Sequence, residues 1–500
     1  MRGKKVAINT VCSLAQEFVS VICGFILPRL ILATFGSKYN GLIASITQFL
    51  SCAVLLRSGL GGVTRAALYK PLALNDHVNI CSIVNATDRY MKRIGMILAV
   101  LILVFATLYP ILIRNEFGWF FTFSLVIIIG ASTFAESFFG ITYLIVLQAD
   151  QRLWVSSVLS IICTILNTLF ASILILNHCS IHVVKMASAI VFVLNPIVLG
   201  RYVRTKYKID KSIPPDYSAI AQRWDAFWHQ ISVFVMYNTD IMILTVFSNM
   251  LEVSVYSVYN MVMHGLKRLI VSFSGSQEAA FGNMIAKKED DILRQNVSVV
   301  ENIMFSLCTI MYSCTSLLIL DFVALYTRQI TDVNYIRPVF AVVVIVANFF
   351  NGVRLPYQAV VEAAGHFKQT KKGAIFEPIM NIVLSIIFVA KYGLVGVAIG
   401  TLAATVFRTI QYSVYMSKHI LNRSIFITLK RCIISASEWG MIIIATKLLV
   451  NTIPGNYFQW IGKSIVTFCV SCIVVIMGNY IVFRKDTSLM LKKVKNIIRK

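Results

Sequence analysis

The sequence predicts an all-α integral membrane protein of about 14 transmembrane helices. We expect two six-helix lobes with the substrate path between them, and two extra C-terminal helices. The first observation behind this is composition: 58% of the 500 residues are hydrophobic and only 14% are charged. A water-soluble chain of this length could not hide so much apolar surface, so its solvent is lipid. The other two observations are the spacing of the apolar runs and an internal similarity.

Apolar runs occur at regular intervals along the whole chain. Each is close to the ~20 residues that cross the hydrocarbon layer of a bilayer. The first run follows Met1-Arg-Gly-Lys-Lys and is too long for the apolar region of a cleavable signal peptide, so we expect it to be a retained helix. The fourteen runs lie near residues 8–34, 40–63, 94–113, 119–147, 154–176, 181–200, 229–250, 253–276, 297–320, 335–361, 374–390, 393–416, 432–450 and 458–483.

Two separate regions of the chain recur at nearly the same offset. Tyr143 matches Tyr357 and, in the helices that follow, Asn167 matches Asn381, in each case 214 positions later. Independently, residues 62–76 resemble residues 275–289, 213 positions later. A shared offset indicates an internal duplication with both copies in the same orientation. Such copies are related by an axis along the membrane normal, a frequent transporter plan with the substrate path between the lobes.

The duplication suggests the domain boundaries. Residues 1–200 form the expected N-lobe of helices one to six, and residues 229–416 the C-lobe of helices seven to twelve. Between them, residues 201–228 are the longest cytoplasmic connection and contain Pro214-Pro215, which is typical of a linker. Residues 417–500 then hold the two additional helices and a basic cytoplasmic tail.

The net charge of +24 could suggest a nucleic-acid partner, but the charges occur in short loops between apolar runs. With the N-terminus in the cytoplasm, the cytoplasmic segments hold 34 of the 46 Lys and Arg residues, against 9 on the outer side. This bias predicts cytoplasmic N- and C-termini. It also predicts anionic membrane lipids as partners of the cytoplasmic face, where residues 66–93 and 278–296 are expected to lie as amphipathic helices. No nucleic acid is expected.

Charged residues inside the apolar runs are the first candidates for a site, because each costs at least ~2.5–3.5 kcal/mol in the bilayer. Arg57 lies in LLRSGLGG, with three glycines within the next five residues. One interpretation is a guanidinium in a water-filled cavity, where its planar fork suits an anionic phosphate. The alternative is an ion pair with an acid such as Glu17 that locks helices one and two together.

Four other cations are candidate substrate-binding residues. Lys267 and Arg268 occupy nearly the position of Arg57 in the second lobe, or extend to the cytoplasmic interface. Arg354 precedes Pro356 in a run expected to be kinked, as helices that line cavities often are. Arg29 lies either near the outer mouth of the same cavity or at the outer interface.

Three acids, Asp240, Glu17 and Glu136, are candidates for ion coupling or for charge pairs with arginine. Asp240, in YNTDIMIL, is either a cation or proton site or the partner of an arginine. The remaining embedded charges are interpreted as structural or as members of packing pairs: Glu362, Glu377, Arg408 and Glu438.

No motif for catalysis or for a metal stands out. The seven histidines lack metal-ligand spacing, and the chain has no HExxH, GxSxG or phosphate-binding glycine loop. Cys469 and Cys472 have CxxC spacing but lie inside an apolar run, where packing is the simpler interpretation. No expected outer loop is long enough for a catalytic domain. We therefore predict a transporter rather than an enzyme, with no metal and no cofactor; a coupling H⁺ or Na⁺ stays open.

Short strings in a fixed order resemble the polysaccharide transporter family of lipid-linked oligosaccharide flippases. This family belongs to the multidrug/oligosaccharidyl-lipid/polysaccharide exporter superfamily. The strings are PRLILATFGSKYNGL, LLRSGLGGVTRAALY, LQADQRLW, NTDIMIL and KYGLVGVAIGT. Their order and spacing carry the resemblance, and none of them indicates a particular substrate.

The resemblance implies an inner-membrane protein whose two six-helix lobes form a V shape around a central cavity. It also implies that this protein turns an undecaprenyl-pyrophosphate-linked oligosaccharide repeat unit to the outer leaflet by alternating access. The repeat units are used for surface polysaccharide such as O-antigen, capsule or exopolysaccharide. Lipid II flippases of the superfamily bind pyrophosphate with arginines on helices one, two and eight. Arg57 matches the helix-two position, Arg29 matches helix one approximately, and Lys267/Arg268 match helix eight in kind. Leu30 follows Arg29 where an acid is expected, which departs from the lipid II pattern.

The mechanism expected on this basis anchors pyrophosphate on Arg57 with Arg268 and Arg354. The polyprenyl tail stays in lipid, and a polysaccharide polymerase is a candidate partner. Two alternatives remain within the superfamily: a drug/cation antiporter, which would need an acidic cavity, and a lipid II flippase. A membrane-bound polymerase or glycosyltransferase is a different class and would need a longer outer loop.

Overall fold

The computed structural model describes residues 2–53, 55, 60–113, 116–218, 234, 238–274, 277–450, 452–484 and 487–489, and over these residues the chain is all-helical. It divides into two compact units, Met1–Ser254 and Val255–Lys500. The expected linker 201–228 falls in the first unit, with residues 219–228 outside the described part of the chain. The lobe boundaries expected from the sequence therefore stay predictions.

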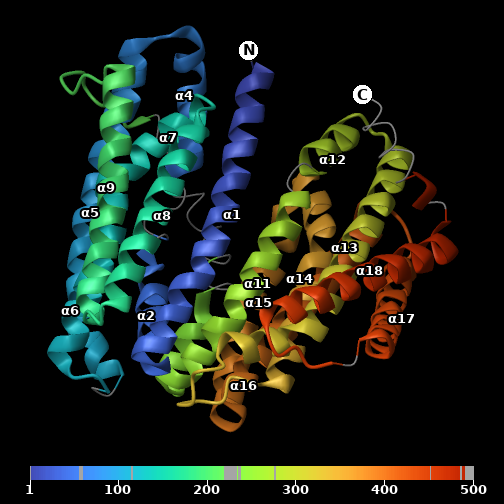
Figure 1. The fold of residues 1–500 in the computed structure, drawn as a ribbon. Helices are drawn as coiled ribbons and strands as arrows, with labels where there is room; N and C mark the ends of the chain where they lie inside the picture. The colour runs from blue at the N-terminus through green and yellow to red at the C-terminus, as the bar shows by residue number, and fades with distance from the viewer. Residues whose placement is uncertain are drawn as a thin grey trace. The chain divides into compact units, whose positions relative to one another are not determined.

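Helices of the first unit run mostly along one direction, up and down (Figure 1). Its elements, in chain order, are α1 (Arg2–Phe35), α2 (Ser37–Leu50), α4 (Leu60–Leu74), α5 (His77–Leu112), α6 (Trp119–Ala135), the π-helical turn η1 (Glu136–Gly140), α7 (Ile141–Ala149), α8 (Leu153–Leu176), α9 (Ile181–Tyr207) and the short helix Asn238–Phe247.

The second unit begins within α11 and repeats this pattern of long helices. Its elements are α11 (Met250–Ser274), α12 (Gln277–Ala286), α13 (Asp290–Tyr326), α14 (Pro338–Ala363), α15 (Phe367–Tyr392), α16 (Leu394–His419), α17 (Phe426–Leu449) and α18 (Tyr457–Val482). Helices α15 and α16 are joined by Gly393, whose φ of 53° is a conformation that glycine adopts without steric cost.

Eleven helices of the described chain are long and apolar enough to cross a membrane. The remaining expected runs, 40–63, 229–250 and 253–276, correspond to α2 with α4, to Asn238–Phe247 and to α11. These elements account in order for the fourteen runs seen in the sequence. The chain is thus an all-α, multi-pass membrane protein, and this prediction is confirmed.

Helix bounds repeat at the offset seen in the sequence. Helix α13 begins 213 residues after α5, α15 begins 214 after α8, and α16 begins 213 after α9. The matched residues Tyr143 and Tyr357 are both buried, at 5% and 0% exposure. This agreement supports an internal duplication that relates α5–α9 to α13–α16.

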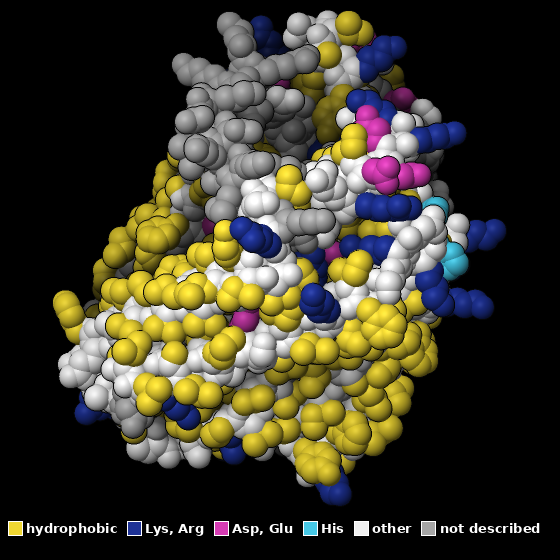
Figure 2. Space-filling view, turned by 90° about the vertical axis from the view of Figure 1, so that its right-hand side faces the viewer, with side chains coloured by type: hydrophobic (Ala, Val, Ile, Leu, Met, Phe, Trp, Pro, Cys, Tyr) yellow, Lys and Arg dark blue, Asp and Glu magenta, His cyan; other side chains and the backbone are white. Residues whose placement is uncertain are grey.

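Exposed surfaces of the helices are apolar, as expected for contact with lipid. Figure 2 shows hydrophobic side chains over a broad band of one face, with most of the visible acidic and basic side chains on one side of that band. Buried positions, in contrast, include many small and polar residues. Helices in lipid gain little from burying apolar surface, so close packing and interhelical hydrogen bonds hold them together instead.

Candidate functional site

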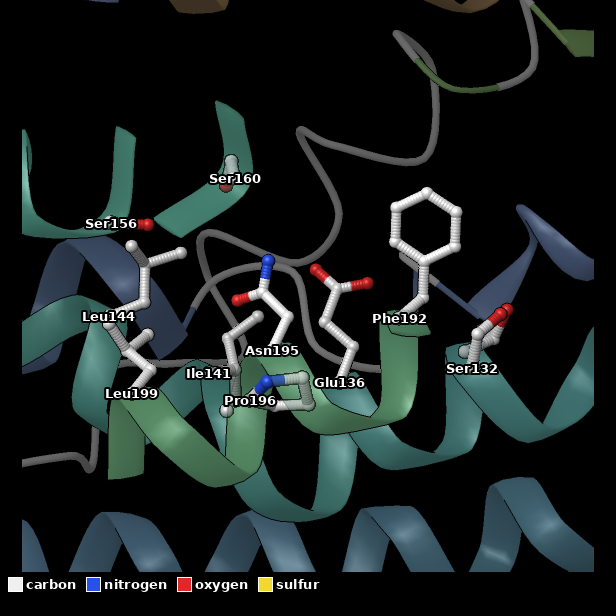
Figure 3. A pocket seen from close by; sticks show the side chains of 12 residues that line it. Ser132, Glu136, Ile141, Leu144, Ser156, Ser160, Phe192, Asn195, Pro196 and Leu199 are labelled. Carbon is white, nitrogen blue, oxygen red and sulfur yellow. The ribbon is translucent and has the colours of Figure 1, made fainter. Parts of the chain in front are cut away.

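A polar pocket of about 300 Å³ lies in the first unit among α6, η1, α7, α8 and α9 (Figure 3). Residues of η1 and α9 form one wall of the pocket, and residues of α8 form another. Six polar side chains line it: Ser132, Thr133, Glu136, Ser156, Ser160 and Asn195. A group of polar residues on three membrane helices is costly in lipid and therefore a candidate for function.

The pocket owes its shape to the π-helical turn that interrupts the run 119–149. Glu136 begins this turn and Gly140 ends it. Gly140 packs so closely on α9 that an added Cβ would lie 2.6 Å from the Cβ of Pro196. Single π-helical turns inside α-helices occur often at functional sites, because they change the direction of the side chains. Here, as Figure 3 shows, Glu136 and Asn195 extend next to each other into the pocket.

The chemistry of the pocket suits a small cation or a proton. It offers one carboxylate together with amide and hydroxyl oxygens, which are the ligands that hard monovalent and divalent cations prefer. Across the described residues, no group of three or more His, Cys, Asp or Glu side chains could hold a metal ion. The sequence identified Glu136 as a candidate, but it missed Ser156, Ser160 and Asn195, because isolated Ser and Asn residues are common in membrane helices.

A buried ion triad lies in the second unit and joins α14, α15 and α16. Arg354 Nη1 lies 2.5 Å from Glu377 Oε1, and Arg408 Nε lies 3.5 Å from Glu377 Oε2. The three residues are only 4–8% exposed. Arg408 also donates to the Thr370 carbonyl at 3.2 Å and to the Tyr412 hydroxyl at 2.7 Å.

Two guanidinium groups share one carboxylate in this triad. Charges removed from water need opposite charges and hydrogen bonds around them, and the triad provides both. The structural interpretation of Glu377 and the pairing of Arg408 agree with this arrangement. Arg354, expected on a cavity wall, is engaged by Glu377 in this conformation, and its contact with substrate stays a prediction.

A second triad of the same composition lies between α13 and α17. Glu301 is fully buried and accepts from both terminal nitrogens of Arg423, which precedes α17. Arg431 Nε lies 3.7 Å from the same carboxylate, and Arg431 also donates to Asn302 at 2.9 Å. Both arginines lie between the expected runs 393–416 and 432–450, in a segment expected on the cytoplasmic side, and Glu301 was not among the candidates predicted from the sequence. Its position inside the run 297–320 was the signal that could have identified it.

The other candidate residues are placed as follows. Arg57 lies outside the described residues. Arg29 of α1 is half-buried, and Lys267 and Arg268 of α11 are half-buried and exposed, respectively. Each of these three described cations takes part in a polar or electrostatic contact, as do Asp240, Glu17 and Glu136.

One packing pair differs from the expectation. Glu438 of α17 is buried, but its partner is the side-chain amide of Asn479 at 3.3 Å rather than a basic residue. Arg408, the other residue expected in a packing pair, lies beside Glu377 instead.

These features define a duplicated, multi-pass helical membrane protein with charged and polar groups inside its helix bundles. No family model matches the chain, and no curated protein matches it. Several solved structures match the chain in fold. The chain is similar to the lipid II flippase MurJ in an inward closed conformation, with a TM-score of 0.70 and 13% identity over 96% of this chain and 99% of that one.

Transporters of the multidrug resistance MATE family are also similar in fold. An inward-facing MATE transporter of the MOP superfamily superposes with a TM-score of 0.65 at 12% identity, over 82% of this chain and 98% of that one. The Vibrio cholerae MATE transporter VcmN in its bent form gives 0.53 at 14% identity, over 83% and 97%. At these identities the similarity shows the fold alone, which this chain shares with these solved transporters.

Proposed function

We propose that this protein is a flippase that moves an undecaprenyl-pyrophosphate-linked oligosaccharide repeat unit from the cytoplasmic to the outer leaflet by alternating access. The observation that carries the proposal is the fold similarity to a lipid II flippase along 96% of the chain. The sequence strings that resemble the polysaccharide transporter family support it independently. The expected location is the bacterial inner membrane, with both termini in the cytoplasm.

Charge supports the proposed substrate class in addition to the fold. A pyrophosphate-linked lipid needs cations near the membrane midplane, and arginine suits phosphate because its planar guanidinium can donate two parallel hydrogen bonds. In the proposed mechanism Arg57 is the main anchor, with Arg268 and Arg354, while Lys267 and Arg29 add positive charge. The Arg354 triad supports such a role electrostatically, since two arginines and one glutamate leave a surplus positive charge.

The two lobes are proposed to rock against each other during transport, so that the cavity opens to one face at a time. Inward-facing and outward-facing forms of a similar MATE-family transporter are known, with TM-scores of 0.65 and 0.54 to this chain. A chain with the same fold could adopt both forms.

Ion coupling is proposed at the pocket around Glu136. A carboxylate with neighbouring hydroxyl and amide oxygens could bind H⁺ or Na⁺ and release it in the other conformation. Asp240 and Glu17 are the alternative coupling residues. A drug/cation antiporter is the second candidate function, because the same acidic pocket would also suit an organic cation and the MATE transporters share the fold.

Complementation in a strain that lacks the chromosomal gene tests the cargo and the anchor together. We expect Arg57→Ala to abolish surface polysaccharide at a normal level of membrane protein, and Arg57→Lys to restore part of it. Arg328→Ala, at an exposed arginine after α13, is the matched control and should retain wild-type polysaccharide. Normal polysaccharide in the deletion strain itself, with altered drug resistance, would instead favour the antiporter.

A further inference from the structure

Helix α17 carries polar residues on the face that packs against the protein. Its buried positions recur every three or four residues and form one stripe: Thr428, Arg431, Ser435, Glu438, Ile442 and Thr446. The exposed face is apolar instead, with Ile433 61%, Ile444 64% and Leu448 81% exposed. The helix therefore places its polar side against the protein and its apolar side toward lipid, as expected for a membrane helix held by hydrogen bonds.

Glu438 lies in the middle of this stripe and is 1% exposed. Helix α18 forms a fitted space for its carboxyl group. Gly478 has no side chain there, and an added Cβ would overlap Glu438 Oε1. The next residue, Asn479, donates from Nδ2 to the same oxygen at 3.3 Å. A glycine and an amide thus receive the carboxyl group, and among the described residues no basic group lies within ion-pair distance of it.

Nearby charged groups are already compensated by other partners. Arg431, two turns from Glu438 on the same stripe, is bound by Glu301, Asn302 and Ser298. At the other end of α18, Lys463 donates to Asp321 at 2.7 Å. The three helices that pack together carry further titratable side chains: Asp290, Asp291, Arg294, Cys308, Tyr312, Cys314 and Tyr326 of α13, Lys430, Cys432 and Lys447 of α17, and Tyr457, Cys469, Cys472 and Tyr480 of α18.

A carboxylate buried without a cation is far costlier than the two carboxylates that arginines hold in this unit. Moving an isolated ion into a low-dielectric interior costs so much that the group takes up a proton instead. Glu301 and Glu377 avoid this cost with two arginines each. Glu438 has an amide donor and a glycine, which accommodate the neutral acid but do not compensate a full negative charge.

We propose that Glu438 is a proton-binding site, and that the bound proton holds α17 and α18 together on α13. The proton comes from water and returns to water, so that one carboxylic acid O–H forms or breaks and no other bond changes. When the proton leaves, the carboxylate faces Gly478 and Asn479 without a counter-charge, which weakens the contact between the two helices. This inference does not depend on the identity of the transported substrate.

A chain of polar contacts connects this site to the Glu301 triad. The Thr487 hydroxyl donates to the Asn479 carbonyl at 3.1 Å, and Asn302 Nδ2 donates to the Thr487 hydroxyl at 3.4 Å. Arg431 then donates to Asn302 at 2.9 Å. Any separation of α18 from α17 would therefore disturb the residues that fasten α17 to α13, so proton loss at Glu438 would loosen both helices together.

The test compares two isosteric substitutions in the purified full-length protein, Glu438→Gln and Glu301→Gln. Infrared spectroscopy detects the carbonyl band of a protonated carboxylic acid, and thermal unfolding in detergent reports stability from pH 5 to pH 9. We expect Glu438→Gln to fold normally, to remove one protonated-acid band, and to remove part of the decline in stability as pH rises. The decline arises because the unfolded chain releases this proton at a lower pH than the folded one.

Glu301→Gln is expected to leave that band in place and to lower the melting temperature strongly, because it leaves two buried arginines without their carboxylate. The proposal is overturned if Glu438→Gln leaves every protonated-acid band intact. It is also overturned if Glu438→Gln destabilises the protein at pH 5 as much as Glu301→Gln does, since either result means that Glu438 is ionised in the folded protein. Transport is not measured in this test, so its failure is separate from a failure of the proposed flippase function.

Discussion

The pocket of the first unit and the Arg354 triad of the second unit occupy matched positions in the internal repeat. In the first unit most of these positions line a cavity of about 300 Å³, and in the second two arginines share one carboxylate. Four pairs, each 213 or 214 residues apart, carry the comparison: Gly140 and Arg354, Ser156 and Thr370, Cys163 and Glu377, and Asn195 and Arg408.

The difference shows how one scaffold can provide two opposite electrostatic environments. Where the first repeat has Gly140, with no side chain, the second has Arg354 with one of the longest. The first site keeps space and a single acid, Glu136, whose matched position holds Phe350. The second site holds two cations against one anion. The first is therefore suited to take up a cation from outside, whereas the second carries its cations within the chain.

The largest expected effect is the loss of the acid that holds the second site together. Glu377→Ala leaves two guanidinium groups buried without a counter-charge, and removing one partner of a buried ion pair costs about 3–5 kcal/mol. Thermal unfolding of the purified protein should show this as a strongly reduced melting temperature. Glu362→Ala is the control, because the Glu362 carboxylate accepts a hydrogen bond from Gln358 of its own helix at 2.8 Å and the residue is half-buried. Equal stability of the two variants would contradict the structural importance of the triad.

Converting the first site into the second is the next test. Asn195→Arg places a guanidinium at the position matched to Arg408, within the pocket that contains Glu136. We expect the variant to fold, because the pocket has room, and to transport without dependence on external H⁺ or Na⁺, because the arginine replaces the coupling cation. Transport into vesicles with and without an ion gradient measures this. Asn195→Leu, which adds volume without charge, should not remove the dependence; if both variants behave alike, the effect is steric.

Glu136→Gln tests the coupling role with a smaller change to the structure. Glu136 is exposed to the pocket, so its replacement by an isosteric amide should change stability by no more than about 0.5 kcal/mol, as for most surface substitutions. Transport driven by an ion gradient should fall, since the amide cannot exchange a proton and binds cations poorly. Glu252→Gln, at the start of α11, is the control. Undiminished gradient-driven transport in Glu136→Gln would move the coupling role to Asp240 or Glu17.

Much of the fold could be predicted from the sequence, because long apolar runs predict membrane helices. The repeat offset found in the sequence also reappears in the helix bounds. The residues of the candidate site were harder to predict from the sequence. Embedded charge identified Glu136 and Arg354 as unusual, but the partners of Arg354 come from helices 23 and 54 residues further on, and no local pattern joins them. Likewise, Asn195 and the pocket serines can be recognised as site residues only in the structure, where the π-helical turn places Glu136 beside them.

The smallest loss of stability is expected at an exposed ion pair of the first unit. This pair tests whether burial is the reason why the Glu377 triad matters for stability. Lys38 Nζ lies 3.4 Å from Glu116 Oε1, but the two side chains are 55% and 28% exposed. Water and salt already screen such a pair, so Lys38→Ala should cost between 0 and about 1 kcal/mol. Melting temperatures at low and high salt measure this, and the small difference should vanish at high salt. If Lys38→Ala destabilised the protein as much as Glu377→Ala, charge pairing alone would explain the triad, and burial would not be the cause of its importance.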